Sequence, residues 1–566
     1  MIKPFQSETG LDLNQIQVSV ENGIPAKYPV NTPVSVLLKS PFNGQGIPFI
    51  AALVNNNVVS FSYPLKINCH VRFLTAGDPQ GMRVYRSSLS FLLAKTVSQF
   101  FPEIRICIEH SLSTGFYCTL ENIKKGVNLK ALIRGIEEAM RQVVADDLPI
   151  ERRKLSFADA ISLLERAGLK EKASLLRFRN PPKITIHWCG GFFDLDHGPL
   201  VSRTGVLKYF RLIDYPPGLV LQFPSQYEPR RVTRFRDQPH LFQIFHEHKE
   251  WGRILGVSNV GRLNELIADD EAGNFIKISE AFHEKKIARI ADAIQARQGQ
   301  ARVLFISGPS AAGKTTFSKR LGVQLEVNGM RPVMLSLDNY YVDDEKTPRD
   351  KSGRRDYEHI QAIDVALFNR HLVSLINGRE IEMTRFDFNR KRRVMTGLGL
   401  KIDRDQIIIV EGIHGLNPAF TPMLERRQQF KIYISALTQL NIDCHNRIST
   451  TDNRLMRRLI RDHTFRGNSP LVTLRMWPGV RRGEKRWIFP FQAQADVFFN
   501  SALDYELAVL KPLVEPLLMQ IKPADPEYAE AVRLQEFLSN FLGITKFEVP
   551  HTSILREFIG ASSFKY

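Results

Sequence analysis

One short segment, RVLFISGPSAAGKTTF at residues 302–317, constrains the fold of this chain more than any other. It contains the pattern G-x-x-x-x-G-K-[ST] as Gly308, Gly313, Lys314 and Thr315, after an apolar strand pattern and before a helical one. Glycines let the backbone curl so that successive N–H groups point at phosphate oxygens, and the positive end of the following helix adds to the attraction. The segment therefore predicts a nucleotide-phosphate loop at the end of a buried strand, with Lys314 on the phosphates and Thr315 on Mg²⁺.

Strand and helix patterns alternate around this loop and after it. The strand patterns lie at 303–307, 333–336, 407–410 and 431–434, and the helical patterns begin at 314 and lie at 365–376, 506–519 and 528–541. Alternation of this kind predicts a parallel sheet with helices on both faces. We therefore expect an α/β domain over residues 286–566.

The first half of the chain shows two other patterns. Short β-type runs separated by Gly, Pro and Asn occupy residues 16–75, which predicts a small β domain over residues 1–78. From residue 79 the apolar spacing becomes helical, and strands are expected again at 183–188 and 219–223. These patterns predict a second domain of α+β type over residues 79–285.

Two acidic residues are expected beside the phosphate loop. Asp338 follows the second strand pattern in VMLSLDNYYVDD, and Glu411 ends the third in IIIVEGIHGL. Ligand crevices of open α/β sheets lie at the carboxyl ends of the strands, so both carboxylates would face the same crevice. There Asp338 would take a proton from an attacking hydroxyl or hold a water of Mg²⁺, and Glu411 would join the metal shell. A helix cap is the alternative role for Asp338.

Arginines cluster in the segment RLMRRLIRDHTFRG. Arg454, Arg458 and Arg461 follow one another at helical spacing, and Arg466 lies near the end of the same helix. Phosphoryl transfer needs cations that close over the developing charge, which an arginine-rich lid supplies, whereas a solvated or RNA-binding helix face is the alternative. The whole chain carries 77 Lys and Arg against 59 Asp and Glu, and this +18 surplus indicates a polyanionic partner without separating nucleotide from nucleic acid.

In this order, GPSAAGKTT, LDNYY, EGIHGL and RLMRRLIRDHTFRG resemble the motifs of the uridine kinase and phosphoribulokinase family, over residues 303–566. The resemblance implies ATP- and Mg²⁺-dependent phosphorylation of a hydroxyl, which in the nearer, uridine kinase branch is the 5′-hydroxyl of a pyrimidine nucleoside. The ATP-binding residues that it implies are Gly308, Ser310, Gly313, Lys314, Thr315 and Thr316. The catalytic residues are Lys314, Asp338, Arg461 and Arg466, and the metal ligands are Thr315, Asp338 and Glu411.

The acceptor side departs from the pattern of that family. Uridine kinases carry FDHPDAFD, whose central Asp holds the ribose hydroxyls, and this chain has YEHIQAID with Gln361 there. The YDF and following His that read the pyrimidine are replaced by Phe386 and Lys391 in TRFDFNRKRR. Together with Tyr341 and Arg458, these are the substrate contacts that the resemblance implies. We expect kinase chemistry on an altered or broadened acceptor, and drift without functional meaning is the alternative.

Residues 16–75 resemble a TGS domain of β-grasp fold. The stretch SFLLAKTVSQFFPEIRICIEHSLSTGFY, with DLDHGP further on, resembles the second additional domain, the editing domain, of threonyl-tRNA synthetase. The positions that match the H-x-x-x-H and C-x-x-x-H motifs of that domain are Ser87, Phe91, Asp196 and Leu200. We therefore expect the fold without its metal motif or editing chemistry. Three roles stay open for this half: binding of a tRNA-like RNA, small-molecule regulation and dimerisation.

Three functions stay open: a nucleoside kinase with accessory front domains, an RNA-associated regulatory P-loop NTPase, and a kinase of another sugar or phosphate acceptor. Five cysteines without a CxxC spacing predict neither a disulfide framework nor a cysteine zinc site. Apolar stretches fall far short of the ~20 residues of a membrane span. We expect a reduced, cytoplasmic protein without a membrane partner, and the oligomeric state is open, a homo-oligomer included.

Overall fold

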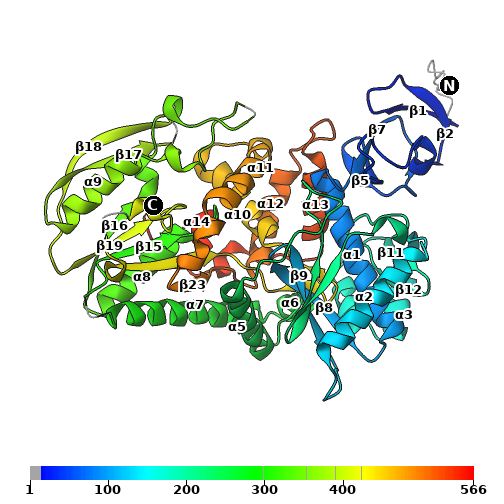
Figure 1. The fold of residues 1–566 in the computed structure, drawn as a ribbon, viewed down its shortest axis with the longest axis horizontal. Coiled ribbons are helices and arrows are strands. Elements are labelled where there is room, and N and C mark those ends of the chain that lie inside the picture. The colour runs from blue at the N-terminus through cyan, green and yellow to red at the C-terminus, as the bar shows by residue number, and fades with distance from the viewer. Residues whose placement is uncertain (1–13, 298, 352, 389, 422–423, 566) are drawn as a thin grey trace, which may run out of the picture.

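The computed structural model describes residues 14–565 except 298, 352, 389 and 422–423. Figure 1 shows an elongated molecule, with the parallel sheet at one end and the small N-terminal sheet at the other. We call residues up to 285 the front half and residues from 286 the back half. In the part of the chain that is described, no helix combines the length and apolarity that crossing a membrane requires.

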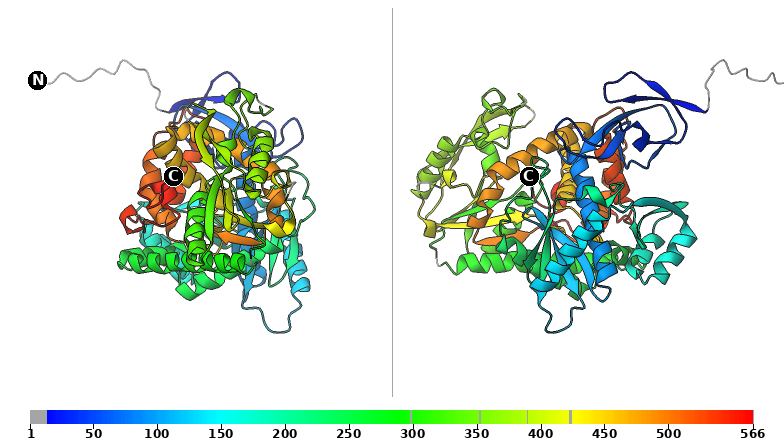
Figure 2. Two further views of the ribbon diagram at one scale, coloured as in Figure 1. Left: turned by 90° about the vertical axis from the view of Figure 1, so that its left-hand side faces the viewer. Right: turned by 45° about the vertical axis from the view of Figure 1, so that its right-hand side comes forward.

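Residues 14–75 form a small β domain. Its five-stranded sheet has the order β2-β1-β7-β4-β5, in which β1 and β7 are parallel and the other pairs are antiparallel. Val18, Ala52 and Val71 are buried in its core. The strands are β1 (Gln15–Val20), β2 (Ala26–Pro29), β4 (Phe49–Val54), β5 (Asn57–Val59) and β7 (Cys69–Thr75), with a short pair β3 (Thr32–Pro33) and β6 (Pro64–Leu65) beside them. In Figure 2 this sheet stands above the rest of the molecule.

The rest of the front half consists of two antiparallel sheets covered by helices. The four-stranded sheet, β13-β14-β9-β8, packs with the two long helices α1 and α2, and the three-stranded sheet, β10-β11-β12, packs with α3 and α4. The strands are β8 (Arg105–Leu112), β9 (Gly115–Glu121), β10 (Glu151–Ser156), β11 (Lys183–Cys189), β12 (Phe192–Leu195), β13 (Arg211–Tyr215) and β14 (Gly218–Gln222). The helices are α1 (Pro79–Phe100), α2 (Leu129–Ala145), α3 (Phe157–Arg166) and α4 (Lys170–Arg177).

The back half contains the predicted parallel sheet, in the order β16-β19-β15-β20-β23. Alternate residues of its central strand enter two different cores: Leu304 and Ile306 pack with α8 and α12, and Val303 and Phe305 pack with α9. Helices therefore cover both faces, as the alternating pattern predicts. The strands are β15 (Val303–Ser307), β16 (Arg331–Ser336), β19 (Gln406–Glu411), β20 (Gln429–Ser435) and β23 (Val497–Asn500), and two hairpins are added by β17 (Ile381–Asp387) with β18 (Arg392–Leu400) and by β21 (Asn441–Asp443) with β22 (Asn446–Arg447).

The two halves share one hydrophobic core. Leu175 and Leu263 of the front half belong to the same buried cluster as Ile442 and Leu510 of the back half. The connecting helices are α5 (Pro239–Leu255), α6 (Val260–Ala268) and α7 (Ala272–Gln295), and α7 crosses the predicted boundary at 285/286 to pack on α8. The back-half helices are α8 (Lys314–Val327), α9 (Val365–Ile376), α10 (Thr450–Arg466), α11 (Pro470–Trp487), α12 (Glu506–Leu518), α13 (Tyr528–Leu538) and α14 (Arg556–Ile559).

A disulfide also joins the halves, which corrects the expectation of a chain without one. Cys107 of β8 is bonded to Cys444, in the turn between β21 and β22. The two cysteines are 337 residues apart, so no local spacing could have indicated the pair.

Candidate active site at the phosphate loop

The two glycines of the phosphate motif are required by the backbone. The loop leaves β15 at Gly308, where a Cβ would collide with the carbonyl oxygen of Ile434 on the neighbouring strand. It enters α8 through Gly313, whose φ of +84° lies in the left-handed region that favours glycine. Lys314 then begins α8, and its Nζ atom lies 3.3 Å from the carbonyl oxygen of Pro309, so the side chain bends back over the loop. The sequence therefore folds here into the predicted strand, loop and helix.

Three arginines of α10 donate hydrogen bonds to residues of the phosphate loop. Arg454 Nε donates a hydrogen bond to the Ser310 carbonyl at 2.9 Å, and Arg458 Nη1 donates to Ser310 Oγ at 2.8 Å. Arg457 Nη1 lies 3.5 Å from the carbonyl oxygen of Ala311. Ser310, predicted as an ATP-binding residue, thus has its hydroxyl and carbonyl engaged by two arginines.

Buried carboxylates neutralise two of these arginines. Arg454 forms an ion pair with Glu484 of α11, and Arg457 forms one with Glu506 of α12. All four side chains are almost completely buried. For this face of α10, burial excludes the alternative of a solvated helix face.

Three arginines in the second half of α10 lie around one acidic residue, Asp462. Arg458 lies 3.0 Å from Asp462, Arg461 lies 2.9 Å from it, and Arg466 lies 3.7 Å from it. All three belong to the arginine cluster from which the sequence predicts a lid. Repulsion by Arg461, together with burial, lowers the pKa of Arg466 to about 10, and Asp338 opposes this shift. Arg466 therefore lies close enough to Asp338, the predicted base, for their charges to attract each other.

Two carboxylates lie at the ends of adjacent strands, and one of them, that of Glu411, contacts Thr315. Glu411 ends β19, and its Oε1 accepts hydrogen bonds from Thr315 Oγ1 at 3.4 Å and Ser336 Oγ at 3.1 Å. Asp338 follows β16 in the short helix η3 (Leu337–Tyr340), whose N-cap is Ser336, not Asp338. Burial and then repulsion by Asp338 raise the pKa of Glu411 to about 7, against the attraction of Lys314.

This set of donors fits a magnesium ion. Thr315, Asp338 and Glu411 offer only oxygen atoms, which hard divalent cations prefer. Two neighbouring carboxylates, one of them buried, also repel each other unless a cation lies between them. The donor chemistry therefore suits the predicted metal ligands.

Aromatic side chains lie among the predicted acceptor contacts. The rings of Tyr341 and Phe386 are buried with their centroids 5.5 Å apart, and the guanidinium of Arg466 lies 5.0 Å from the ring of Phe388. Burial raises the pKa of Tyr341, and repulsion by Asp338 adds to the shift. Tyr341 and Phe386 therefore lie near the predicted base.

Two other predicted acceptor contacts are exposed. Gln361 lies in the short helix η5 (Ile360–Ala362), and Lys391 lies in the turn of the β17–β18 hairpin, where its carbonyl accepts a hydrogen bond from the Asp344 amide at 3.1 Å. Their roles as substrate contacts stay predictions.

Sequence reasoning missed two glutamates at the loop. Glu358 has a buried Oε2 atom without a hydrogen-bond partner, and burial raises its pKa to about 7 although Arg458 and Lys314 attract its charge. Glu557 of α14 accepts hydrogen bonds from Thr316 N at 3.1 Å and Thr316 Oγ1 at 3.0 Å. Neither glutamate belongs to the four motifs, so no local pattern indicated them.

Comparison with known proteins finds two different groups of relatives along the chain. Residues 303–508 match the family model described as "Phosphoribulokinase / Uridine kinase family". The N-terminal region matches threonine–tRNA ligases. The ligase of Geobacter sp. (strain M21) is 31% identical over 208 residues, which are 35% of this chain and 31% of the ligase. That of Coxiella burnetii is 33% identical over 193 residues, 32% of this chain and 28% of the ligase.

The chain thus spans about a third of the length of these curated relatives. Among solved structures, one described as a possible uridine kinase from Bacillus stearothermophilus is 18% identical and covers 38% of this chain and 98% of its own, with a TM-score of 0.27. A D-glycerate 3-kinase from Cryptococcus neoformans is 13% identical and covers 45% and 87%, with a TM-score of 0.21. Residues 303–508 of the back half thus match the phosphoribulokinase and uridine kinase family, and the N-terminal region is similar to threonine–tRNA ligases.

Proposed function

We propose that this protein is an ATP- and Mg²⁺-dependent kinase that phosphorylates a hydroxyl of a small molecule, namely the 5′-hydroxyl of a pyrimidine nucleoside or of a related compound. One observation carries the proposal. Lys314, Thr315 and the carboxylates of Asp338 and Glu411 meet at the carboxyl ends of adjacent parallel strands, with Arg466 near Asp338. A nucleotide switch needs the loop and the metal ligands but not an acidic base facing arginines.

Each group has a role in such a transfer. The loop amides and Lys314 would hold the ATP phosphates, and Asp338 would accept the proton of the acceptor hydroxyl as it attacks. Arg461 and Arg466, positioned by Asp462, would neutralise charge on the transferred phosphoryl group. Bound to the oxygen donors beside Thr315, Mg²⁺ would neutralise the phosphate oxygens.

The acceptor assignment is supported by the aromatic pair. Tyr341 and Phe386 present ring surfaces near Asp338, which suits a planar base or a sugar ring better than a highly charged acceptor. Phe386 lacks a hydroxyl to read the base, so we propose that the acceptor is selected mainly by shape and stacking.

The test is ADP release by the full chain with ATP, Mg²⁺ and a panel of ribonucleosides, deoxynucleosides and sugar phosphates. We expect turnover that requires a nucleoside, and a loss of about 100-fold or more in Asp338→Asn with ATP binding retained. Asp405→Asn, at an exposed surface ion pair, is the matched control. Unchanged acceptor-dependent turnover in Asp338→Asn would refute the assignment of the base.

A second candidate function is an RNA-associated regulatory NTPase, favoured by the ligase-like front half and the +18 charge. In that case the front half would bind a tRNA-like RNA. Hydrolysis stimulated by bulk tRNA, with no dependence on any acceptor, would support this function over the kinase.

A further inference from the structure

A cavity of about 690 Å³ lies between the two halves, and none of the phosphate-loop residues lines it. Its walls come from α1 and β11 of the front half and from β22, α10, α11 and α13 of the back half. All four positions that match the ligase editing motifs line it: Ser87, Phe91, Asp196 and Leu200. Its volume is that of a small-molecule site.

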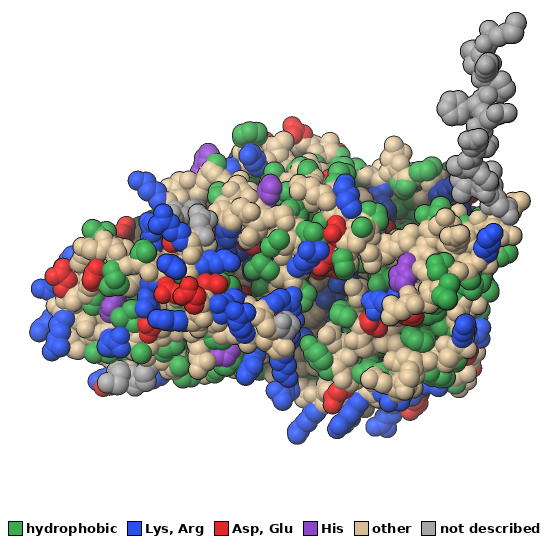
Figure 3. Space-filling view, turned by 90° about the horizontal axis from the view of Figure 1, so that it is seen from above, with side chains coloured by type: hydrophobic (Ala, Val, Ile, Leu, Met, Phe, Trp, Pro, Cys, Tyr) green, Lys and Arg blue, Asp and Glu red, His purple; other side chains and the backbone are tan. Residues whose placement is uncertain are grey.

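Arginines from both halves converge on this cavity. Arg83 and Arg86 come from α1, Arg447 from β22 and Arg481 from α11. Arg83 lies 2.7 Å from Glu530 and Arg481 lies 2.6 Å from Glu484, so these two are paired. Figure 3 shows Lys and Arg side chains around a hollow near the middle of the upper face.

The other two arginines lack such partners. Over the described residues, no carboxylate lies within ion-pair distance of Arg86 or Arg447. The Nε atom of Arg86 is buried without a hydrogen-bond partner, and its guanidinium lies 4.7 Å from the ring of Phe223. The guanidinium of Arg447 lies 4.5 Å from the ring of Phe116. Aromatic contacts thus hold two cations at the cavity without an ion pair, and Asp452, which attracts Arg447, lies beyond ion-pair distance.

These cations also repel each other. Burial, Arg447 and Arg83 together lower the pKa of Arg86 to about 10, and burial lowers the pKa of Arg447 to about 10 against the attraction of Asp452. An anion between the two side chains would relieve both the desolvation and the repulsion, and it would receive charge-assisted hydrogen bonds.

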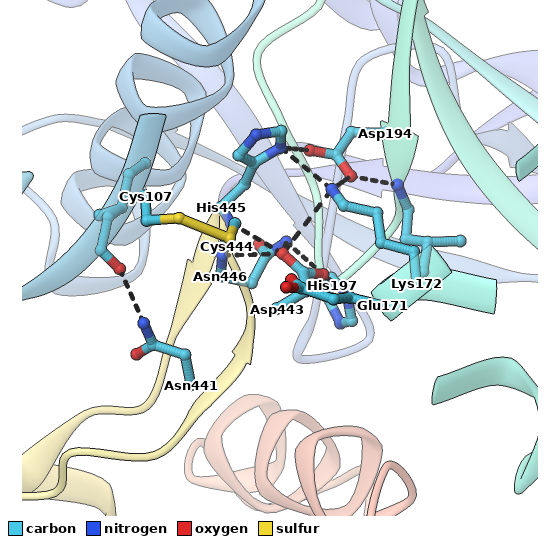
Figure 4. Close-up of polar contacts among 12 residues, drawn as sticks. Cys107, Glu171, Lys172, Asp194, His197, Asn441, Asp443, Cys444, His445 and Asn446 are labelled. Atoms are coloured by element: carbon cyan, nitrogen blue, oxygen red, sulfur yellow. Dashed lines mark hydrogen bonds and ion pairs between the residues drawn. A yellow bond between two sulfur atoms is a disulfide. The ribbon is translucent and has the colours of Figure 1, made fainter. Parts of the chain in front are cut away.

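The cavity is pre-formed because a polar network fixes the hairpin that carries Arg447. Figure 4 shows His445 and Asp443 of the hairpin turned toward Asp194 and Lys172 of the front half. His445 Nδ1 lies 2.6 Å from Asp194, and Asp443 lies 3.3 Å from His197 and 3.7 Å from the buried Lys172. A ligand would therefore find Arg447 already in place, which lowers the entropic cost of binding.

One cavity residue leads directly to the phosphate loop. Arg481 donates to Oε2 of Glu484, and Oε1 of the same carboxylate pairs with Arg454 and accepts a hydrogen bond from the Ser310 amide at 3.3 Å. An anion that drew Arg481 toward the cavity would weaken its hold on Glu484. The Ser310 amide would then lose its hydrogen bond to Glu484.

We propose that this cavity binds a phosphate-bearing small molecule of nucleotide size, with a phosphate between Arg86 and Arg447, and that its binding changes the affinity of the phosphate loop for ATP through Arg481 and Glu484. The binding part stands on the cavity alone, and only the second part rests on the proposed kinase function. A small molecule is favoured over RNA because back-half elements close one side of the cavity.

Binding is tested by calorimetry on the full chain, with the phosphate loop filled by Mg²⁺ and a non-hydrolysable ATP analogue. Inorganic pyrophosphate and uridine and adenosine 5′-monophosphates are the probes. We expect saturable binding of at least one probe, weakened about tenfold or more in Arg86→Gln and in Arg447→Gln. Arg134→Gln, at an exposed site on α2 outside the cavity, is the matched control. Arg86→Lys and Arg447→Lys keep the charge and should retain part of the affinity.

Three results would overturn the proposal: no saturable binding of any probe, equal binding in both Gln variants with unchanged melting temperatures, or Arg86-dependent binding of bulk tRNA alone. Coupling is tested by the probe's effect on the KM for ATP, which we expect to disappear in Arg481→Gln. The chain carrying Asp338→Asn should still bind the probe. Failure of the kinase assignment and failure of the cavity are therefore distinguishable.

Discussion

Glu358 shows how a single buried carboxylate beside the phosphate loop makes stability depend on pH. Its pKa is about 7 in the folded chain and ~4.3 when unfolded, so the folded state favours the protonated form. The contribution of protonated Glu358 to the free energy of unfolding is fully present below the unfolded pKa. It is lost as the pH rises through the folded pKa of about 7. Glu358→Gln removes the cost of ionisation, so we expect it to stabilise the protein by about 1–3 kcal/mol at pH 8 and little at pH 5.

Thermal unfolding at both pH values measures this difference. Glu326→Gln, at an exposed position on α8, is the control and should have the same small effect at both. A stabilisation by Glu358→Gln that is equal at pH 5 and pH 8 would contradict the prediction.

The carboxylate of Glu557 lies at the start of α8, where the phosphates of a nucleotide are predicted to bind. Its carboxylate accepts hydrogen bonds from the amide and hydroxyl of Thr316, a predicted ATP-binding residue. A negative charge there repels phosphate, so we expect Glu557→Gln to lower the KM for ATP by about three- to tenfold. Steady-state kinetics, with the exposed Glu548→Gln as control, measure the effect. A raised KM would show instead that Glu557 supports the loop.

Some residues of the candidate site could be predicted from local sequence patterns, and others could not. Lys314, Asp338 and Glu411 were predicted because each follows a strand pattern in a short motif, and parallel strands bring their ends together. Glu358, Glu484 and Glu557 reach the loop from distant parts of the sequence. Their positions depend on tertiary packing, which spacing along the chain does not encode.

Among the elements, α10 combines a structural face with a face at the candidate site. Arg457 is fully buried and paired with Glu506, whereas Arg461 is partly exposed and paired with Asp462. Removing one partner of a buried pair leaves an uncompensated charge, so we expect Arg457→Ala to destabilise the fold by about 3–5 kcal/mol. We expect Arg461→Ala to lower kcat by about 100-fold, with little change in stability.

Denaturant unfolding and kcat measured on both variants separate the two effects. Equal losses of stability in Arg457→Ala and Arg461→Ala would mean that α10 does not have separate structural and candidate-site faces. The comparison needs no third variant, because each arginine serves as the control for the other.

Helices and strands were predicted correctly where burial of one or both faces gives the apolar residues a regular spacing. They were missed where no such spacing exists. The strand pattern at 407–410 and the helical pattern at 365–376 correspond to β19 and α9, which are buried on one or both faces. The β17–β18 hairpin escaped notice because β18 is largely exposed and carries no apolar alternation. The short β21–β22 hairpin is held by contacts with the front half, which the sequence does not show.

On the scale of the whole molecule, the shared core and the polar network make the two halves one unit. Asp443 is completely buried, accepts a hydrogen bond from the His445 amide at 2.8 Å, and pairs with Lys172 and His197 across the junction. We therefore expect the intact chain to unfold in a single calorimetric transition. Asp443→Ala leaves Lys172 with Asp194 as its remaining carboxylate partner, which should destabilise the whole chain by about 3–5 kcal/mol.

Scanning calorimetry of the intact protein and of Asp443→Ala tests this coupling, with Asp405→Ala at an exposed surface pair as the control that should change stability by about 0–1 kcal/mol. A shift of one undivided transition in Asp443→Ala would show that the junction belongs to the common fold. Two separate transitions in the intact chain, of which Asp443→Ala moves only one, would mean that the halves fold independently. Because the halves share one core, neither can rearrange without the other. Binding at the cavity between them can therefore alter the phosphate loop.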